Sequence, residues 1–202
     1  MKTDIHVSKI NFMREAILEK AEQQLMQGGY DKLNFATIAK ELDTTRANLH
    51  YHFKNKETLA IEVTRQYANR YIEEFSLLRE TFNGNFIGFF ETVENMIWMH
   101  SGGSDDDKMA SCSTLVSDPE LPESIAKLSR ENYGKIEVTI AGVLQDAINN
   151  NEIRQDIDVK REAARSHVIM MGIGTCGEYL LNVKQAKERF GGMLEEWAHN
   201  LK

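Results

Sequence analysis

The chain has 202 residues, of which 42% are hydrophobic, so it is long enough for one domain or two small ones with a buried core. Its two cysteines, Cys112 and Cys176, exclude a disulfide framework and lack the paired spacing of a zinc site. No apolar stretch approaches the roughly 20 residues that span a bilayer, and the N-terminus has no charged-then-apolar secretion pattern. We therefore expect a soluble, cytoplasmic protein without a membrane partner.

The formal net charge of -7 argues at first against binding to nucleic acid, because affinity for phosphates comes largely from Lys and Arg. The charge is unevenly distributed, however. Residues 1–56 carry 9 basic and 7 acidic side chains, whereas the rest of the chain carries 15 and 24. Residues 44–56 hold three basic side chains, Arg46, Lys54 and Lys56, and no acidic one. The N-terminal part is therefore the candidate contact surface.

Apolar spacing predicts helices along the whole chain, and the two prolines leave long segments free to be helical. The first helix runs from about residue 10 and should end at Gly28-Gly29. No strand pattern and no internal repeat is found. The expected fold is all-α, with about nine helices. The later ones are predicted at about 34–42, 45–53, 57–80, 85–100, 108–117, 122–150, 159–182 and 185–201.

Residues 34–53 predict a helix-turn-helix. Asn34 is suited to be the N-cap of its first helix, since its side-chain oxygen can accept a backbone N–H of the first turn. Asp43 stands where the chain must turn and tolerates left-handed backbone angles better than most residues. Thr45 can cap the second helix. These local signals fix both the start of each helix and the turn between them.

The second of these helices has two different faces. Leu49 and Phe53 should face back toward Ile38 and Leu42 of the preceding helix. The opposite side is polar or amphipathic without an intramolecular reason, which leaves it free to enter a major groove of DNA. That side carries Arg46, Asn48, His50, Tyr51 and His52.

Residues 9–59 resemble the DNA-binding head of the TetR family of bacterial transcriptional regulators. The matching stretches are Ala16-Ile17-Leu18, Gly29-Tyr30, Ile38-Ala39 and the run from Leu49 to Leu59. The last run is the most specific, since it fixes aromatic, His, Phe and Lys positions in one register. The resemblance implies a DNA-binding domain over residues 1–56 and an effector-binding and dimerisation domain over residues 57–202.

The chain departs from the family pattern at two positions. Asp43 stands where the family usually has Gly, and Asp can take the turn angle at modest cost. His50 stands where the family usually has Tyr, which commonly contacts a phosphate. Imidazole could do the same with some pH dependence, and whether His50 reads phosphate or base stays open at this point.

Roles in DNA binding follow from the position of each residue. Thr44, Thr45 and Arg46 begin the recognition helix and should reach base edges, with Arg46 able to fork onto guanine O6 and N7. Asn34 and Lys56 begin helices, where a phosphate is favoured. Tyr51 could pack on a thymine methyl or the sugar-phosphate wall. For Lys54 and Lys56 the alternative to a phosphate contact is a role in solubility alone. The predicted DNA-binding set is Asn34, Thr44, Thr45, Arg46, Asn48, His50, Tyr51, His52 and Lys56.

The C-terminal part resembles the family only in architecture. Residues 151–158 are similar to the turn that commonly precedes the penultimate helix, which implies that the last two helices pair with their symmetry mates in a dimer. An apolar stripe on the final helix supports this. Three glycines on the preceding helix do so too, because each glycine inside a helix costs about 1 kcal/mol of stability, and close approach of helices at the dimer gives a reason for them. A kinked helix beside a cavity is the alternative. The predicted interface residues are Gly172, Gly174, Gly177, Phe190, Leu194, Trp197 and Leu201.

The resemblance also implies a ligand cavity between the helices of the C-terminal part. Methionine adapts to irregular apolar shapes and suits a pocket for a hydrophobic or aromatic effector. Simple core packing is the alternative for each candidate, and for Cys112 and Cys176 a buried apolar role is favoured over redox sensing. The candidates are Phe89, Met96, Trp98, Met99, His100, Met109, Cys112, Tyr133, His167, Met170 and Met171.

These observations predict a homodimeric repressor that a small effector releases from a palindromic operator, with recognition helices about 34–36 Å apart. The alternative is an activator or adaptor that uses the same head without small-molecule induction. An enzyme is not expected, since the sequence offers no nucleophile–base pair, carboxylate pair or metal cluster. His50 and His52 point different ways on a helix, and residues 105–107 lack the pattern of a calcium loop. No cofactor is expected.

Overall fold

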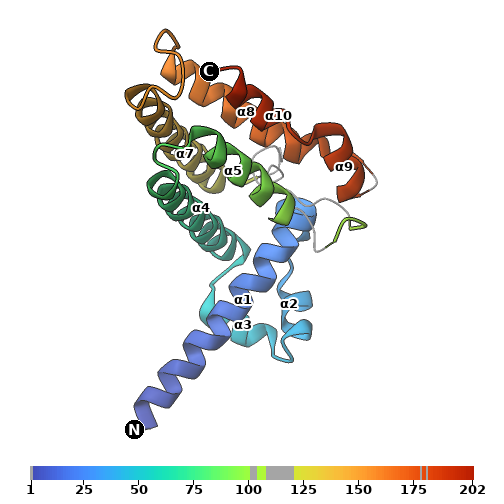
Figure 1. Cartoon of the computed structure of the whole chain (residues 1–202). Helices are drawn as coiled ribbons and strands as arrows, with labels where there is room; N and C mark the ends of the chain where they lie inside the picture. Colours follow the sequence, from blue (N-terminus) through green and yellow to red (C-terminus); the bar gives the residue numbers. More distant parts are fainter. Residues whose placement is uncertain (1, 101–103, 108–120, 178, 181) are drawn as a thin grey trace. The chain divides into compact units, whose positions relative to one another are not determined.

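A computed structural model describes residues 2–100, 104–107, 121–177, 179–180 and 182–202 of the protein. The all-α fold is confirmed, whereas the helix predicted at 108–117 lies outside the described residues. None of the helices in the described ranges is both long and apolar enough to cross a membrane. The helices, labelled in Figure 1, are α1 (Lys2–Lys32), α2 (Phe35–Glu41), α3 (Arg46–His52), α4 (Lys56–Thr81), α5 (Phe86–His100), α7 (Glu123–Asn149), α8 (Val159–Gly177), α9 (Val183–Phe190) and α10 (Met193–His199).

The chain divides into two compact units. One comprises Met1–Ala68 and Thr114–Arg130, and the other comprises Asn69–Ser113 and Glu131–Lys202. The division falls inside both α4 and α7, so each of these helices contributes to both units. The domain boundary expected after residue 56 falls at the beginning of α4, before the point where the two units divide. It stays a prediction.

The first unit is built on the apolar stripe of α1. Ile17 and Leu25 of this stripe are fully buried, and so are Ile38 of α2 and Leu49 of α3. The break predicted at Gly28-Gly29 is confirmed, because both residues have non-helical backbone angles and Gly29 has φ +70°. Glycine accepts this angle without the steric penalty that a Cβ would bring. The stripe therefore ends where the chain turns toward α2.

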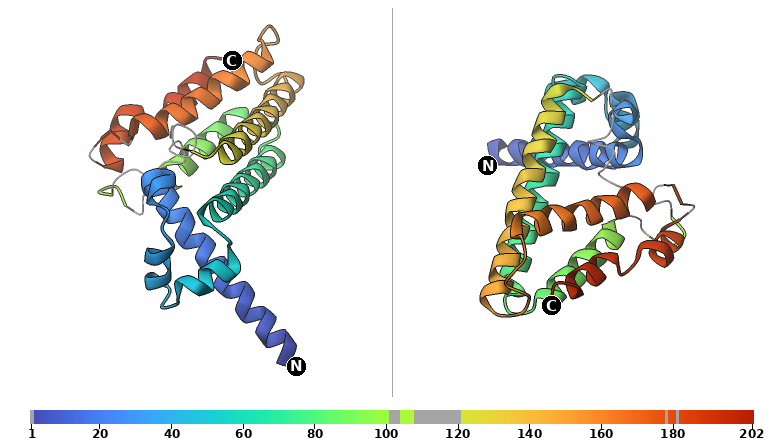
Figure 2. Two further views of the ribbon diagram at one scale, coloured as in Figure 1. Left: turned by 180° about the vertical axis from the view of Figure 1, so that it is seen from behind. Right: turned by 90° about the horizontal axis from the view of Figure 1, so that it is seen from above.

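The core of the second unit is rich in aromatic side chains. Figure 2 shows α5, α8 and α10 side by side in both views, and all three helices contact one another. Phe86 and Phe90 of α5 pack edge-on, with ring centroids 5.0 Å apart, and Phe90 packs edge-on against Trp197 of α10 at 4.8 Å. A smaller cluster joins Trp98 to Ile173 and to residues of α9.

The single helix predicted at 185–201 is wrong, since the chain breaks between α9 and α10 at Gly191 and Gly192. Gly192 has φ +84°. The buried carboxylate of Glu94 on α5 accepts hydrogen bonds from the backbone amides of Gly192 and of Leu194, the latter at 3.0 Å. A distant side chain thus supplies the cap that α10 lacks locally. The helix predicted at 159–182 also ends early, at Gly177.

Candidate functional site

The helix-turn-helix is set by caps and by one left-handed residue. The Asn34 side-chain oxygen accepts from the amides of Ala36 at 2.8 Å and Thr37 at 3.3 Å, so it caps α2. The Thr45 hydroxyl accepts from the Asn48 amide at 3.2 Å and caps α3. Asp43 has φ +47°, as its place in the turn predicts. The predicted local structure of residues 34–53 is therefore confirmed.

The two faces of α3 are also as predicted. Leu49 is fully buried, and Phe53, which follows the helix, is 2% exposed. On the other side Arg46 and His50 are exposed, and Tyr51 is 73% exposed. The polar face of α3 therefore points to solvent, while its apolar face packs against the core.

Several predicted DNA-binding side chains have partners within the chain. The Asn48 amide nitrogen donates to the Thr44 hydroxyl at 3.0 Å. The His50 ring lies 4.8 Å from the Phe35 ring of α2, and its Nδ1 is 3.1 Å from the carbonyl oxygen of Lys54. These contacts orient polar groups on the surface of α3 before any partner binds.

His52, another residue of the predicted DNA-binding set, is half-buried beside Arg14 of α1. Burial, and to a smaller degree the charge of Arg14, lowers the pKa of His52 below its ordinary value, which favours the neutral ring. Arg14 also forms an ion pair with Glu62 of α4 at 2.6 Å, and its guanidinium carbon lies 5.1 Å from the centre of the Phe53 ring. Sequence reasoning missed Arg14, and the pattern of α1 carries no local signal for it.

Lys56 begins α4, and its ammonium group is held near the end of α1. Its Nζ lies 4.4 Å from the centre of the Tyr30 ring and 3.4 Å from the carbonyl oxygen of Asp31. The preceding Asn55 accepts from the amide of Thr58 at 2.8 Å and from its hydroxyl at 2.9 Å, as an N-cap does. Sequence reasoning missed Asn55, although an Asn directly before a helix is the usual signal.

The helix-turn-helix and the helices on either side of it have known relatives. Residues 17–63 match the family model of the bacterial regulatory proteins of the tetR family. The head of this chain is therefore a TetR-family DNA-binding domain. Members of the TetR family are DNA-binding transcriptional regulators rather than enzymes, which agrees with the prediction that this chain is not an enzyme.

A curated relative supports the same assignment over the TetR-family head. The transcriptional regulator QacR of Staphylococcus aureus is 29% identical over 63 residues, which cover 31% of this chain and 34% of QacR. The chain thus spans about a third of the length of this curated relative.

Solved structures extend the likeness in fold to almost the whole chain. A TetR-family regulator from Agrobacterium tumefaciens has a TM-score of 0.81 and 18% identity, over 93% of this chain and 98% of that one. The TetR-family regulator CifR, solved with a 26 bp double-strand operator DNA, has a TM-score of 0.73 and 16% identity, over 92% of this chain and 95% of its own.

The effector candidates fall into different environments. Phe89 is 1% exposed in the aromatic core, and Trp98 belongs to the smaller cluster, so both are core residues. Met99 is 75% exposed and His100 is exposed, so neither lines an enclosed space formed by the described residues. Met109 and Cys112 lie outside the described residues. The partly buried candidates that remain are Met96, Tyr133, Met170 and Met171.

His167 is the one effector candidate with both burial and charged surroundings among the described residues. It is 6% exposed, its Nδ1 lies 3.3 Å from Oε1 of Glu137, and its ring lies 4.9 Å from that of Tyr133. Burial lowers the pKa of His167 below its ordinary value, while the hydrogen bond and charge of Glu137 act in the opposite direction.

We expect folding stability to fall as the pH drops below the ordinary histidine pKa of about 6.5, because the unfolded His167 takes up a proton before the buried ring does. Urea unfolding of the protein and of His167→Gln at about pH 7.5 and about pH 5.5 measures this loss. The loss should be smaller in the variant. An equal loss in both proteins would assign the pH dependence to other groups.

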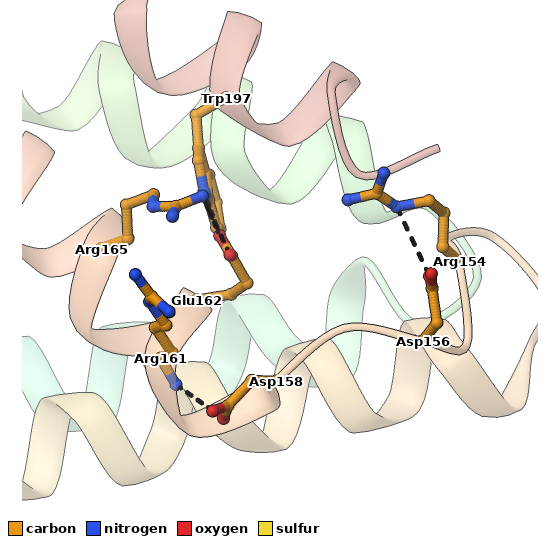
Figure 3. Close-up of polar contacts among 7 residues, drawn as sticks. All are labelled: Arg154, Asp156, Asp158, Arg161, Glu162, Arg165 and Trp197. Carbon is orange, nitrogen blue, oxygen red and sulfur yellow. Dashed lines mark hydrogen bonds and ion pairs between the residues drawn. The ribbon is translucent and has the colours of Figure 1, made fainter.

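The predicted dimer residues of the last helix are mostly buried within their own chain. Leu194, Trp197 and Leu201 are 0%, 6% and 2% exposed and belong to the core of the second unit. Figure 3 shows the Trp197 indole nitrogen donating to the Glu162 carboxylate, at 2.9 Å. The prediction that these three side chains form a stripe facing a symmetry mate is therefore wrong, since each packs inside the protomer.

The other dimer candidates lie on or near α8. Gly174 and Gly177 are buried, and Phe190 is half-buried against the small cluster around Trp98. Gly172 has open space where a Cβ would stand. These positions leave an outward face of α8 on which five side chains are exposed around the half-buried Gly172. We call it the α8 stripe, and it comprises Arg161, Arg165, Val168, Gly172, Cys176 and Tyr179, the last just beyond the helix.

A groove of about 430 Å³ runs between α8 and α10 next to the α8 stripe. Ile169, Met193 and Trp197 are among the apolar residues that line it. Arg154 and Arg165 line it as well. Figure 3 shows these two arginines, with Arg165 paired to Glu162 at 2.9 Å and Arg154 near Asp156 at 3.7 Å. The groove thus combines an apolar floor with a charged rim.

Proposed function

We propose that this TetR-family regulator is a homodimeric repressor that occupies a palindromic operator and that a small hydrophobic or aromatic effector releases. One observation carries the proposal, namely the exposed polar face of α3, held outward between capped helices. A recognition helix presented in this way fits the major groove of DNA. The operator complex of CifR, a regulator of similar fold, supports the same use of the head.

The residues of α3 divide into base and phosphate contacts. Thr44, Thr45 and Arg46 stand at the start of α3, which is the part of a recognition helix that contacts base edges. The exposed guanidinium of Arg46 can donate two hydrogen bonds to guanine. Tyr51 lies farther along α3 and Lys56 begins α4, and both suit the sugar-phosphate wall. Base contacts then set sequence preference, and phosphate contacts set register.

Arg46→Ala should weaken binding to the preferred operator by about 1–3 kcal/mol and relax the sequence preference at one position of each half-site. The operator is first selected from a random-sequence duplex library with the wild-type protein. Titration of wild type and variant against that duplex and against a scrambled duplex then gives both quantities.

Arg189→Ala is the matched control, since it removes an exposed arginine of α9 that lies in the second unit, outside the head, the α8 stripe and the adjoining groove. Its affinity for the selected duplex should equal that of the wild type. A selection that enriches no duplex would contradict the proposed function itself, and a palindrome should be visible in the sequences that are enriched.

The α8 stripe is the proposed contact with a second copy. In a two-fold dimer the same patch meets itself, and a helix with a small residue at its centre lets its mate approach closely. Gly172 occupies the middle of the stripe, and Val168 and Tyr179 are apolar side chains 71% and 86% exposed on either side of it. Exposed apolar surface of this kind favours an interaction site. The adjoining groove would receive side chains of the second copy.

The effector is proposed to act by preferring a conformation that does not bind DNA. The partly buried Met96, Met170 and Met171, together with Tyr133 and His167, are the proposed ligand contacts. A preference of about 2–3 kcal/mol for the non-binding state shifts operator affinity by roughly two decades. A thermal-shift screen detects such a ligand, because occupancy raises stability by RT ln(1 + [L]/Kd).

The direction of regulation has its own test. Transcription of a reporter placed behind the selected operator should rise when the gene of this protein is deleted. A fall in transcription would instead identify an activator, and the DNA-binding part of the proposal would stand.

A further inference from the structure

His50 holds one of its ring nitrogens in a contact that fixes the position of its proton. Nδ1 lies 3.1 Å from the carbonyl oxygen of Lys54. A carbonyl oxygen only accepts hydrogen bonds, so Nδ1 carries a hydrogen and donates it. In the neutral ring the other nitrogen, Nε2, then has no hydrogen and presents a lone pair.

The ring lies on the side of the head where DNA phosphates are expected. His50 is exposed in the second half of α3, and its ring packs 4.8 Å from that of Phe35, the first residue of α2. In a helix-turn-helix the first helix crosses the sugar-phosphate backbone, while the start of the second helix reads the bases. A side chain of α3 that packs on α2 is therefore nearer to phosphate than to base edges.

We propose that His50 binds a DNA phosphate through Nε2–H and does so only as the imidazolium ion. The inference rests on the proposed DNA-binding function and adds proton dependence to it. A neutral ring with Nδ1 committed to Lys54 turns a lone pair toward the anionic phosphate, which is repulsive. Protonation converts the same nitrogen into a charged donor, and each head takes up one proton when it binds.

The charged and titratable groups around the ring are consistent with this exchange. On α3 they are Arg46, one turn earlier, and His52, and Lys54 follows the helix. From α2 the ring meets Phe35, which does not titrate, and the nearby cap Asn34 carries no charge. Within the described part of the chain His50 has no ion pair with a carboxylate. Only an added anion therefore compensates the charge of its imidazolium.

The test measures affinity for the duplex selected by the wild-type protein, at constant salt, from about pH 8.5 to about pH 6. We expect wild-type affinity to rise as the pH falls, by up to about tenfold per pH unit for each head. His50→Phe keeps an aromatic ring against Phe35 but has no donor, and its affinity should stay low and flat. His50→Tyr donates from a hydroxyl at every pH in this range, and its affinity should stay high and flat.

His199→Gln serves as the control, because His199 is an exposed histidine of α10 outside the head. It should keep the wild-type slope. In NMR titrations the Cε1–H signal of His50 should move at a higher pH in the complex than in the free protein. A slope that persists in His50→Phe, or a wild type without a slope, overturns the inference and leaves the proposed function standing. A protein that binds no duplex at any pH overturns both.

Discussion

Trp197→Ala should lower the free energy of unfolding by about 3–5 kcal/mol, the range for removing a large aromatic side chain from a core. The side chain is 6% exposed, and its ring packs edge-on against Phe90 at 4.8 Å. Its indole nitrogen also donates to the Glu162 carboxylate, and Glu162 is 8% exposed. The truncation therefore leaves a cavity and removes a donor from a buried carboxylate, and both effects act in the same direction.

Urea unfolding followed by far-UV circular dichroism measures this loss without relying on the fluorescence of the deleted ring. Leu77→Ala is the matched control, since Leu77 is an apolar side chain that is 64% exposed, and its effect should stay within about 0.5 kcal/mol. A Trp197→Ala protein that is as stable as the wild type, but no longer dimeric, would restore the original prediction that this ring faces a second copy.

The helix-turn-helix could be predicted because its determinants are local. Asn34 and Thr45 cap helices that begin within two residues of them, and Asp43 turns the chain by its own backbone angle. Leu49 and Phe53 are spaced four residues apart with polar or amphipathic residues between them, and this spacing identifies which face of α3 is buried. Each of these signals acts over a few residues, so a single sequence is enough to read them.

The break between α9 and α10 could not be predicted in the same way. Gly172 and Gly174 lie inside the helix α8, whereas Gly191 and Gly192 end one, so the residue type alone does not decide. The difference comes from Glu94, whose carboxylate accepts from backbone amides about a hundred residues farther along the chain. Such a contact depends on how α5 packs against α10, and no local pattern encodes it.

The apolar stripe of the last helix shows a second limit. Periodicity correctly identifies Leu194, Trp197 and Leu201 as one apolar face, and the structure buries all three. The same pattern results whether that face packs on its own chain or on a symmetry mate. The exposed α8 stripe had no comparable signal, because Arg161 and Arg165 interrupt its apolar character. Only the packed chain distinguishes the two faces.

Val168→Glu should convert the protein to a monomer and lower operator affinity by about 10²–10⁴-fold, the usual gain from joining two binding modules. Val168 is 71% exposed in the protomer, so the change should leave the fold of a single chain intact. In a two-fold dimer the substitution places two carboxylates close together and removes them from water, and both effects disfavour association. Analytical ultracentrifugation and titration of the selected duplex measure the two consequences.

Leu77→Glu provides the matched control, because it introduces the same charge at a similarly exposed apolar position of α4, outside the α8 stripe. It should remain dimeric and bind the operator as the wild type does. The binding data separate two ways of losing affinity. A dimerisation defect weakens binding to a full palindrome but leaves binding to an isolated half-site unchanged, whereas a damaged head weakens both. A Val168→Glu protein that stays dimeric would remove the α8 stripe from the interface and assign dimerisation to another face.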